Sequence, residues 1–217
     1  MLISMSRQIP LKLAHPLRYS SDSFIAHQGA VAAVDGVVRL ASVNSFSLVY
    51  VRGDRGAGKT HMGVYLAGQL QDASLRVRFL AASQVAEWCV EELPREAIHG
   101  REVLIIDDAD TFLASETHSG VFGTLLERFR AARGMLLLLG TLPLDQVQTG
   151  RANVSFLEAA VSLELDAPED TLRPTLLGAI LEQRGRRLSA AKRLQALRQE
   201  PRSLLTLVRF IEALESR

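Results

Sequence analysis

The sequence has a single cysteine, no excess of charge of either sign and no long apolar run. With Cys89 alone, an intrachain disulfide or a zinc site built from several cysteines is excluded. Lys and Arg number 25 and Asp and Glu 24, so the charge of +1 argues against nucleic-acid binding through bulk positive charge. The aliphatic run 135–139 is far shorter than the roughly 20 residues that span a bilayer. The first residues also lack the pattern of a signal peptide, so we expect a cytoplasmic protein with no membrane partner.

Apolar residues make up 47% of the 217 residues and charged residues 23%, which is ordinary for a globular protein. Short β-rich runs alternate with segments of helical periodicity, and this predicts an α/β fold with a parallel sheet. The five expected strands are residues 47–51, 76–80, 103–106, 135–139 and 161–165. Helices are expected up to about Leu70, after Ser83 as an N-cap, and over residues 116–133, where Gly134 ends the helix.

The polar segment 166–170 favours a domain boundary, because no strand pattern follows it. Beyond it the sequence predicts three helices, over 169–184, 189–198 and 202–216. We therefore expect an extended N-terminal arm (1–18), an α/β body (19–166) and a small helical lid (167–217). On the lid, a solvated face is a better interpretation than DNA contact for the basic residues Arg184, Arg186, Arg187, Lys192 and Arg193.

A phosphate-binding motif follows the first expected strand. Glycines let successive backbone N–H groups converge on phosphate oxygens, and the next helix presents its positive end to the same anion. Lys59 would reach the β- and γ-phosphates, and the Thr60 hydroxyl would bind Mg²⁺. The simpler alternative is a glycine-rich turn with a solvated lysine. The P-loop pattern G-x-x-x-x-G-K-[ST] is satisfied in full by Gly53-Asp54-Arg55-Gly56-Ala57-Gly58-Lys59-Thr60.

Two adjacent carboxylates follow the third expected strand. Asp107 and Asp108 would lie at the carboxyl end of a buried strand, where ligands bind in an open α/β sheet. Asp107 is therefore a candidate partner of Mg²⁺, and Asp108 a candidate for polarising an attacking water. Capping of the next helix is the alternative for both. Asp110 is expected to be an exposed turn residue.

Five stretches of the chain carry a family resemblance: Tyr19-Ser20-Ser21-Asp22-Ser23-Phe24-Ile25, Gly58-Lys59-Thr60-His61, residues 103–108, Leu138-Leu139-Gly140-Thr141-Leu142-Pro143 and Glu200-Pro201-Arg202-Ser203-Leu204. Together they resemble a AAA+ ATPase of the DnaA branch, and most of all its short homologues of the Hda type. The resemblance implies ADP or ATP with Mg²⁺ as cofactors. It implies an adenine pocket at Phe24 and Ile25, with His61 beside the P-loop. Thr141 would then be the sensor I residue and Arg202 the sensor II residue, although by spacing alone each could equally lie on the surface.

The N-terminal arm contains a second candidate motif, formed by Gln8, Ile9, Leu11 and Leu13. It resembles the hexapeptide Q-x-x-L-x-L with which bacterial proteins bind the DNA polymerase sliding clamp. Leu11 and Leu13 would fill an apolar groove, Gln8 would fix the register by hydrogen bonds, and Pro10 would preorganise the extended backbone. An apolar arm that packs on its own domain is the alternative.

The chain departs from the family at the arginine finger. Phe156 stands where the resemblance places an arginine that acts on a neighbour's nucleotide, and a phenylalanine cannot neutralise transition-state charge. Arg151, Arg130 or Arg133 could substitute, or Arg151 is a solvated loop residue.

The resemblance implies a regulator of replication initiation that acts on DnaA, with the sliding clamp as a second partner and a homo-oligomer possible. Sequence-specific DNA binding is not expected, because the helix-turn-helix domain of the family is absent from this sequence. The alternatives are an autonomous ATPase of the helicase-loader type and an adaptor that has lost hydrolysis.

Overall fold

A computed structural model describes residues 24–87, 101–147, 149–150, 153–199 and 204–215. The clamp-binding candidates Gln8, Ile9, Leu11 and Leu13, the sensor II candidate Arg202 and the loop residue Arg151 lie outside these residues. Within the described part, no helix is long and apolar enough to cross a bilayer.

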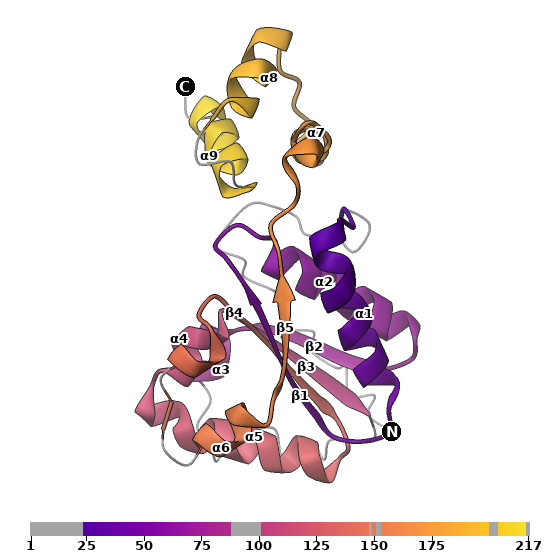
Figure 1. Cartoon of the computed structure of the whole chain (residues 1–217), viewed down its shortest axis with the longest axis vertical. Helices are drawn as coiled ribbons and strands as arrows, with labels where there is room; N and C mark the ends of the chain where they lie inside the picture. Colours follow the sequence, from indigo (N-terminus) through magenta and orange to yellow (C-terminus); the bar gives the residue numbers. More distant parts are fainter. Residues whose placement is uncertain (1–23, 88–100, 148, 151–152, 200–203, 216–217) are drawn as a thin grey trace, which may run out of the picture.

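The core of the body is a parallel sheet of five strands in the order β2-β3-β4-β1-β5 (Figure 1). The continuous aliphatic runs of the three central strands are buried, as parallel strands covered on both faces require. The edge strand β5 is mostly exposed. The predicted α/β fold with a parallel sheet is therefore confirmed. The strands are β1 (Ser47–Gly53), β2 (Arg76–Ala81), β3 (Glu102–Asp107), β4 (Met135–Gly140) and β5 (Val161–Leu165).

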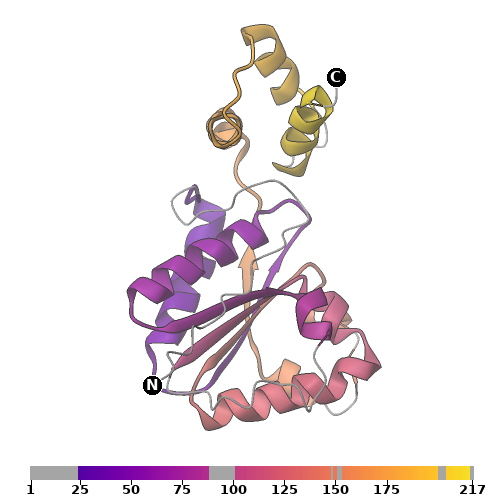
Figure 2. The same cartoon turned by 180° about the vertical axis from the view of Figure 1, so that it is seen from behind.

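Helices cover both faces of the sheet (Figures 1 and 2). On one face, α1 (Gln28–Ser42) and α2 (Lys59–Asp72) pack on alternate strand residues such as Val51 and Leu137. On the other face, Tyr50, Leu138 and their neighbours form a second apolar cluster with the remaining helices of the body. These are α3 (Ala82–Ala86), α4 (Ala109–Leu113), α5 (Ser119–Ala131), η3 (Leu144–Gln146) and α6 (Val154–Glu158), and the short η2 (Glu116–His118) connects α4 to α5.

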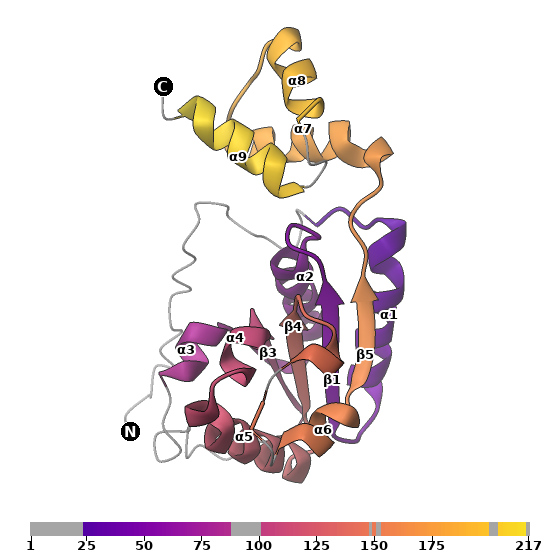
Figure 3. The same ribbon diagram turned by 60° about the vertical axis from the view of Figure 1, so that its left-hand side comes forward.

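The three C-terminal helices form a separate unit with its own apolar core, which includes Leu177, Ala196 and Leu207. They lie beyond the carboxyl ends of β1 and β5 (Figure 3). Ser189 begins the middle helix as an N-cap, because its hydroxyl accepts a hydrogen bond from the Lys192 amide. The elements are η5 (Asp170–Leu172), α7 (Arg173–Gln183), α8 (Ala190–Leu197) and α9 (Leu204–Glu215), and we call α7–α9 the lid.

Two local predictions were wrong. Ser83 is not an N-cap, because α3 already begins at Ala82 and the Gln84 side chain accepts the Ala81 amide at 2.9 Å. The helical segment expected over 116–133 is present as η2 followed directly by α5, but its left-handed end residue is Arg133, with φ of 55°, and not Gly134. Gly134 follows because a Cβ there would lie 2.6 Å from the Glu102 carbonyl oxygen.

Gly63 marks the closest approach of α2 to the sheet. A Cβ at this position would lie 2.5 Å from Phe79 Cε2 and 2.8 Å from Leu139 Cδ1. Gly63→Ala should therefore lower the free energy of unfolding by about 1–3 kcal/mol, through overpacking. Gly178→Ala in α7 is the control, since nothing lies within 4 Å of its added Cβ and alanine favours the helix by about 0.5–1 kcal/mol. Urea unfolding measures the free energy of unfolding of both variants. Equal changes in the two variants would contradict this packing.

Candidate functional site

Three neighbouring strands end at one edge of the sheet, where they bring together segments far apart in the sequence. Since β3, β4 and β1 are adjacent and parallel, Asp107, Gly140 and Gly53 lie at the same edge. The loop 54–58, Thr141 and Asp108 follow directly from these strand ends. Ligands bind at this edge in open α/β sheets, and the candidate residues therefore converge on a suitable place.

The loop 54–58 has the backbone conformation that its glycines permit. Gly56 and Gly58 have φ of 86° and 99°, and the Ala57 amide donates to the Asp54 carbonyl oxygen at 3.0 Å. Helix α2 begins directly after the loop, without a side-chain cap at Gly58. The positive end of a 14-residue helix therefore points at this loop, which favours an anion there.

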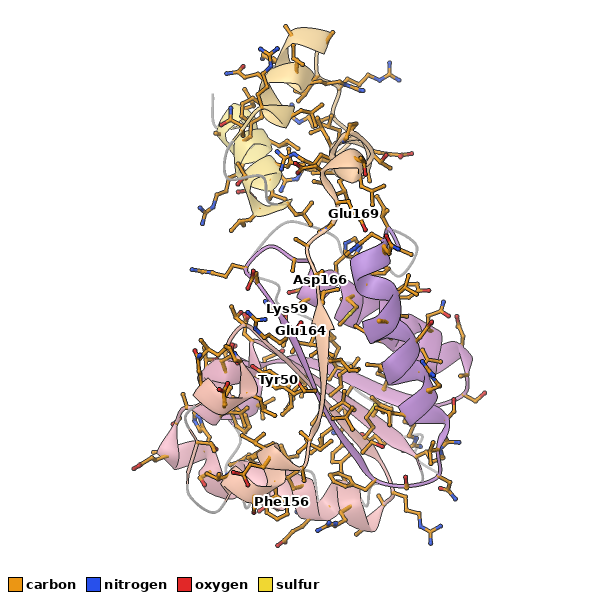
Figure 4. All side chains as sticks on the ribbon, viewed as in Figure 1. Tyr50, Lys59, Phe156, Glu164, Asp166 and Glu169 are labelled. Carbon is orange, nitrogen blue, oxygen red and sulfur yellow. The ribbon has the colours of Figure 1, made fainter. Side chains whose placement is uncertain are left out.

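Lys59 is not solvated, contrary to the simpler alternative. The residue is 8% exposed, and Nζ donates to the carbonyl oxygens of Gly53 (2.6 Å) and Asp54 (3.2 Å) and to Thr141 Oγ1 (3.0 Å). Burial lowers the pKa of Lys59, and the nearby carboxylates, Asp108 first, partly offset this effect. An ammonium group is thus held between the ends of β1 and β4 (Figure 4).

Thr60 and Asp107 form the second part of the site. Thr60 Oγ1 donates to Asp107 Oδ2 at 2.7 Å, and Asp107 is 7% exposed. Burial raises the pKa of Asp107, which the hydrogen bond from Thr60 partly offsets. Asp107 Oδ1 is buried and makes no hydrogen bond of normal geometry within the described residues.

This pair fits Mg²⁺, since a hydroxyl and a buried carboxylate are oxygen ligands of the kind it takes. The described residues contain no group of three or more His, Cys, Asp and Glu side chains that could hold a metal ion. A cation at Thr60 and Asp107 would therefore depend on oxygens from a bound phosphate and water as well.

Asp108 follows Asp107 at the end of β3, is exposed and has φ of 53°, which is uncommon for a residue other than glycine. Its side chain makes no capping hydrogen bond to α4, so the helix-cap alternative is wrong for this residue. The role of Asp108 in polarising water stays a prediction.

The expectation for Asp110 was wrong. Asp110 is half-buried in α4, and its Oδ2 accepts the amides of Thr141 (2.5 Å) and Leu142 (3.2 Å). Its Oδ1 accepts the hydroxyl of Tyr50 at 2.5 Å. Burial raises the pKa of Tyr50, and the hydrogen bond with Asp110 raises it further. The Tyr50 hydroxyl therefore stays protonated. Asp110 and Tyr50 therefore hold the backbone at the candidate residue Thr141, a contact that the sequence did not predict.

A cavity of about 350 Å³ joins these groups to the lid. Its polar end contains the loop residues 55–58, Lys59, Thr60 and Thr141. Its mostly apolar part includes Phe24 and Ile25, with His61, from the body, and Leu176, Ile180, Leu204, Leu205 and Val208, with Arg209 and Glu212, from the lid.

Phe24 lies in this apolar part at the centre of an aromatic group. It stacks on Tyr65, with ring centroids 4.7 Å apart, and meets His61 edge-on at 5.6 Å. His27 also lines the cavity, and burial lowers its pKa. A cavity with a cationic, amide-rich end and an apolar end can hold a phosphate group joined to a flat heterocycle.

Other candidate residues lie elsewhere. Phe156, in the position of the arginine finger, packs against the body core near the end of the sheet opposite Lys59 (Figure 4). The Arg130 guanidinium lies 5.9 Å from the centroid of the Phe46 ring. The solvated-face interpretation was wrong for Arg184, whose side chain is 7% exposed and pairs with Glu212 at 3.2 Å. Arg186, Arg187, Lys192 and Arg193 are exposed.

Comparison with known proteins gives matches among solved structures alone. No family model matches the sequence, and no curated protein matches it. The chain is similar to a DNA replication initiation factor (TM-score 0.73, 18% identity, 92% of this chain and 64% of that chain). It is also similar to the replication initiator DnaA bound to AMPPCP and single-stranded DNA (TM-score 0.68, 18% identity, 93% of this chain and 65% of that chain). A third similar structure is domain III of the Thermotoga maritima replication initiation protein DnaA (TM-score 0.69, 16% identity, 93% of this chain and 90% of that chain).

The chain thus spans about two thirds of the length of the first two structures and nearly all of the isolated domain. At these identities the similarity concerns the fold. The resemblance drawn from the sequence is confirmed at that level: this chain has the α/β fold found in domain III of DnaA.

Proposed function

We propose that this protein is a regulator of chromosomal replication initiation that binds ADP or ATP with Mg²⁺. In the proposal it docks on the DNA polymerase sliding clamp and acts on DnaA. The observation that carries nucleotide binding is the meeting of Lys59, the Thr60–Asp107 pair and Thr141 at the polar end of one cavity, in a DnaA-type fold.

The proposed nucleotide site assigns separate tasks to the two ends of the cavity. The amides of Gly56 to Thr60 and the Lys59 ammonium would bind the β- and γ-phosphates, and Phe24 and Ile25 would pack on the adenine. Mg²⁺, held by Thr60 and through Asp107, would neutralise charge on the phosphates. Asp108 and Thr141 would orient the water at the γ-phosphate in any hydrolysis.

The lid gives the nucleotide a way to alter the shape of the protein. Because α7 and α9 contribute to the cavity together with the P-loop, a nucleotide in it would contact the body and the lid at once. A ligand that contacts one arrangement of two parts better than another shifts the population toward it. We therefore interpret the protein as a nucleotide-controlled switch, with turnover slow or absent.

The sliding clamp is the proposed docking partner of residues 8–13. Replacing Gln8 and Leu11 together with alanine should weaken clamp binding by about 10–100-fold, because both the register contact and an apolar anchor are lost. Lys12→Ala is the matched control, since this position is variable in the hexapeptide pattern. Surface plasmon resonance with purified clamp measures the affinity. Unchanged affinity of the double variant, with nucleotide binding intact, would remove this part of the proposal.

The action on DnaA rests on the fold and the sequence resemblance, and Phe156 separates this chain from the family pattern. A pull-down with purified sliding clamp and purified DnaA, each with ADP and with ATP, tests both partners. The proposal expects capture of both, with the capture of DnaA dependent on which nucleotide is bound. Capture of neither in any nucleotide state would overturn it.

An autonomous ATPase of the helicase-loader type is the second candidate. It is favoured by Asp108, which is exposed at the edge of the cavity where a water-polarising carboxylate would be needed. It expects appreciable ATP turnover that single-stranded DNA stimulates. Phosphate release with and without single-stranded DNA separates it from the regulator.

A further inference from the structure

Tyr50 and Asp110 form a hydrogen bond next to Thr141, although they come from separate elements. Tyr50 belongs to the central strand β1 and is fully buried, whereas Asp110 lies in α4, sixty residues further along the chain. Their contact, Tyr50 Oη to Asp110 Oδ1, is 2.5 Å long. The carboxylate is thus anchored to a fully buried side chain of an inner strand.

Asp110 and Tyr50 contact the backbone of the residues that directly follow β4. Asp110 Oδ2 accepts the amides of Thr141 and Leu142, at 2.5 and 3.2 Å. Tyr50 Oη also lies 2.8 Å from the Leu142 carbonyl oxygen. Two consecutive amides are therefore bound by the Asp110 carboxylate, at a point where the strand ladder has ended, and the one hydroxyl hydrogen of Tyr50 is donated to Asp110.

Gly140 gives this arrangement the space that it needs. A Cβ at Gly140 would overlap the Tyr50 hydroxyl and Asp110 Oδ1, so both groups pack directly against the glycine backbone. Three segments of the chain thus fit together at Thr141: the middle of β1, the start of α4 and the end of β4.

The consequence concerns the hydroxyl of Thr141, which accepts a hydrogen bond from Lys59 Nζ at 3.0 Å. A P-loop lysine reaches the β- and γ-phosphates, so a hydroxyl this close to its ammonium lies where the terminal phosphate of a triphosphate would bind. A diphosphate has no group at that place. The position of Thr141 should therefore affect ATP and leave ADP unaffected.

We propose that Asp110, anchored by Tyr50, is a positioning residue that sets the Thr141 hydroxyl beside Lys59 and thereby lets the site discriminate ATP from ADP. This inference rests on the proposed nucleotide binding and adds to it the residues that control the response to the terminal phosphate. The role needs the acceptor oxygens of Asp110 and does not need its charge. Asparagine can still accept both amides through Oδ1, while its Nδ2 donates to Tyr50 Oη and Tyr50 donates to the Leu142 carbonyl.

The test is the ratio of the dissociation constants for MgADP and MgATP, measured by calorimetry on the full chain. Asp110→Ala should lower the preference for ATP over ADP about tenfold, with the ADP constant within about twofold of the parent. Asp110→Asn should restore most of the ratio. In a double-mutant cycle, Asp110→Ala should add little to Thr141→Val, because both act on one hydroxyl. Asp35→Ala, an exposed aspartate of α1, is the matched control.

Several results would overturn the inference. Equal losses of ATP and ADP affinity in Asp110→Ala would mean a general structural role, and additive effects in the cycle would mean that Asp110 does not act through Thr141. If Asp110→Ala does not fold, Tyr50→Phe replaces it, and an unchanged ratio in that variant overturns the inference. A parent protein that binds neither nucleotide defeats the proposed function itself, before any variant is compared.

Discussion

Lys59→Ala should weaken the binding of both MgATP and MgADP by at least about 100-fold. Lys59 places the only ammonium among the described lining residues of the cavity, and Nζ is already held 3.0 Å from Thr141 Oγ1 at its polar end. A charge-assisted contact to a phosphate contributes roughly twice as much as a neutral hydrogen bond, and Lys59 would make such contacts to two phosphates of ATP. Calorimetry or fluorescence titration with a nucleotide analogue measures the loss.

The fold should survive this change, and this makes the result interpretable. Lys59→Ala removes three hydrogen bonds but also a buried positive charge, so the free energy of unfolding should change by less than about 1 kcal/mol. Lys192→Ala in α8 is the matched control, since this lysine is exposed. Nucleotide affinity that falls equally in the two variants, or in neither, would contradict the role of Lys59.

Asp107→Asn should abolish the dependence of ATP affinity on Mg²⁺. In the parent, Mg²⁺ should strengthen ATP binding by about 10–100-fold over binding in EDTA, because Thr60 and the buried carboxylate of Asp107 supply oxygens to the cation. Asparagine keeps the size of the side chain and an acceptor for the Thr60 hydroxyl, but it removes the negative charge. The measurement is the ATP dissociation constant of each protein with Mg²⁺ and with EDTA.

The same substitution should not destabilise the protein in the absence of Mg²⁺. Burial raises the pKa of Asp107 in the folded state, so its charged form costs stability at neutral pH and the cost falls as pH decreases through that pKa. An uncharged asparagine removes this cost. Asp35→Asn is the control, because this carboxylate is exposed on α1. If Asp107→Asn keeps the full Mg²⁺ effect, the assignment of Asp107 to the cation is wrong.

The inner strands could be predicted because each is a short apolar run buried on both faces, and the edge strand β5 because polar and apolar residues alternate along it. Helix α1 could not. Its inward face consists of small residues, Ala30, Ala33, Val37 and Ala41, while Val31 and Val38 on its outer face are 48% and 38% exposed. The small inward-facing residues and the exposed valines reduce the contrast between the buried and exposed sides of the helix.

Some residues of the candidate site could likewise be predicted from the sequence, and others could not. The P-loop and Asp107 could be predicted because their chemistry is encoded in consecutive residues next to a strand. The contacts of Tyr50 and Asp110 form because β1 and β4 are neighbours in the sheet and because α4 lies next to Thr141. No local sequence pattern predicts these contacts. The lid residues Leu205 and Arg209 line the cavity for a similar reason, since only the folded chain brings them close to the P-loop.

Hydrogen exchange of the full chain, with and without excess MgADP, tests most directly whether a nucleotide occupies the cavity between the body and the lid. We predict that MgADP slows amide exchange in the P-loop and the first turn of α2, over residues 54–61, and also in α7 and α9 of the lid. Both segments line the same cavity, so one ligand should protect them together. Unchanged exchange over residues 54–61 at saturating MgADP would contradict the account.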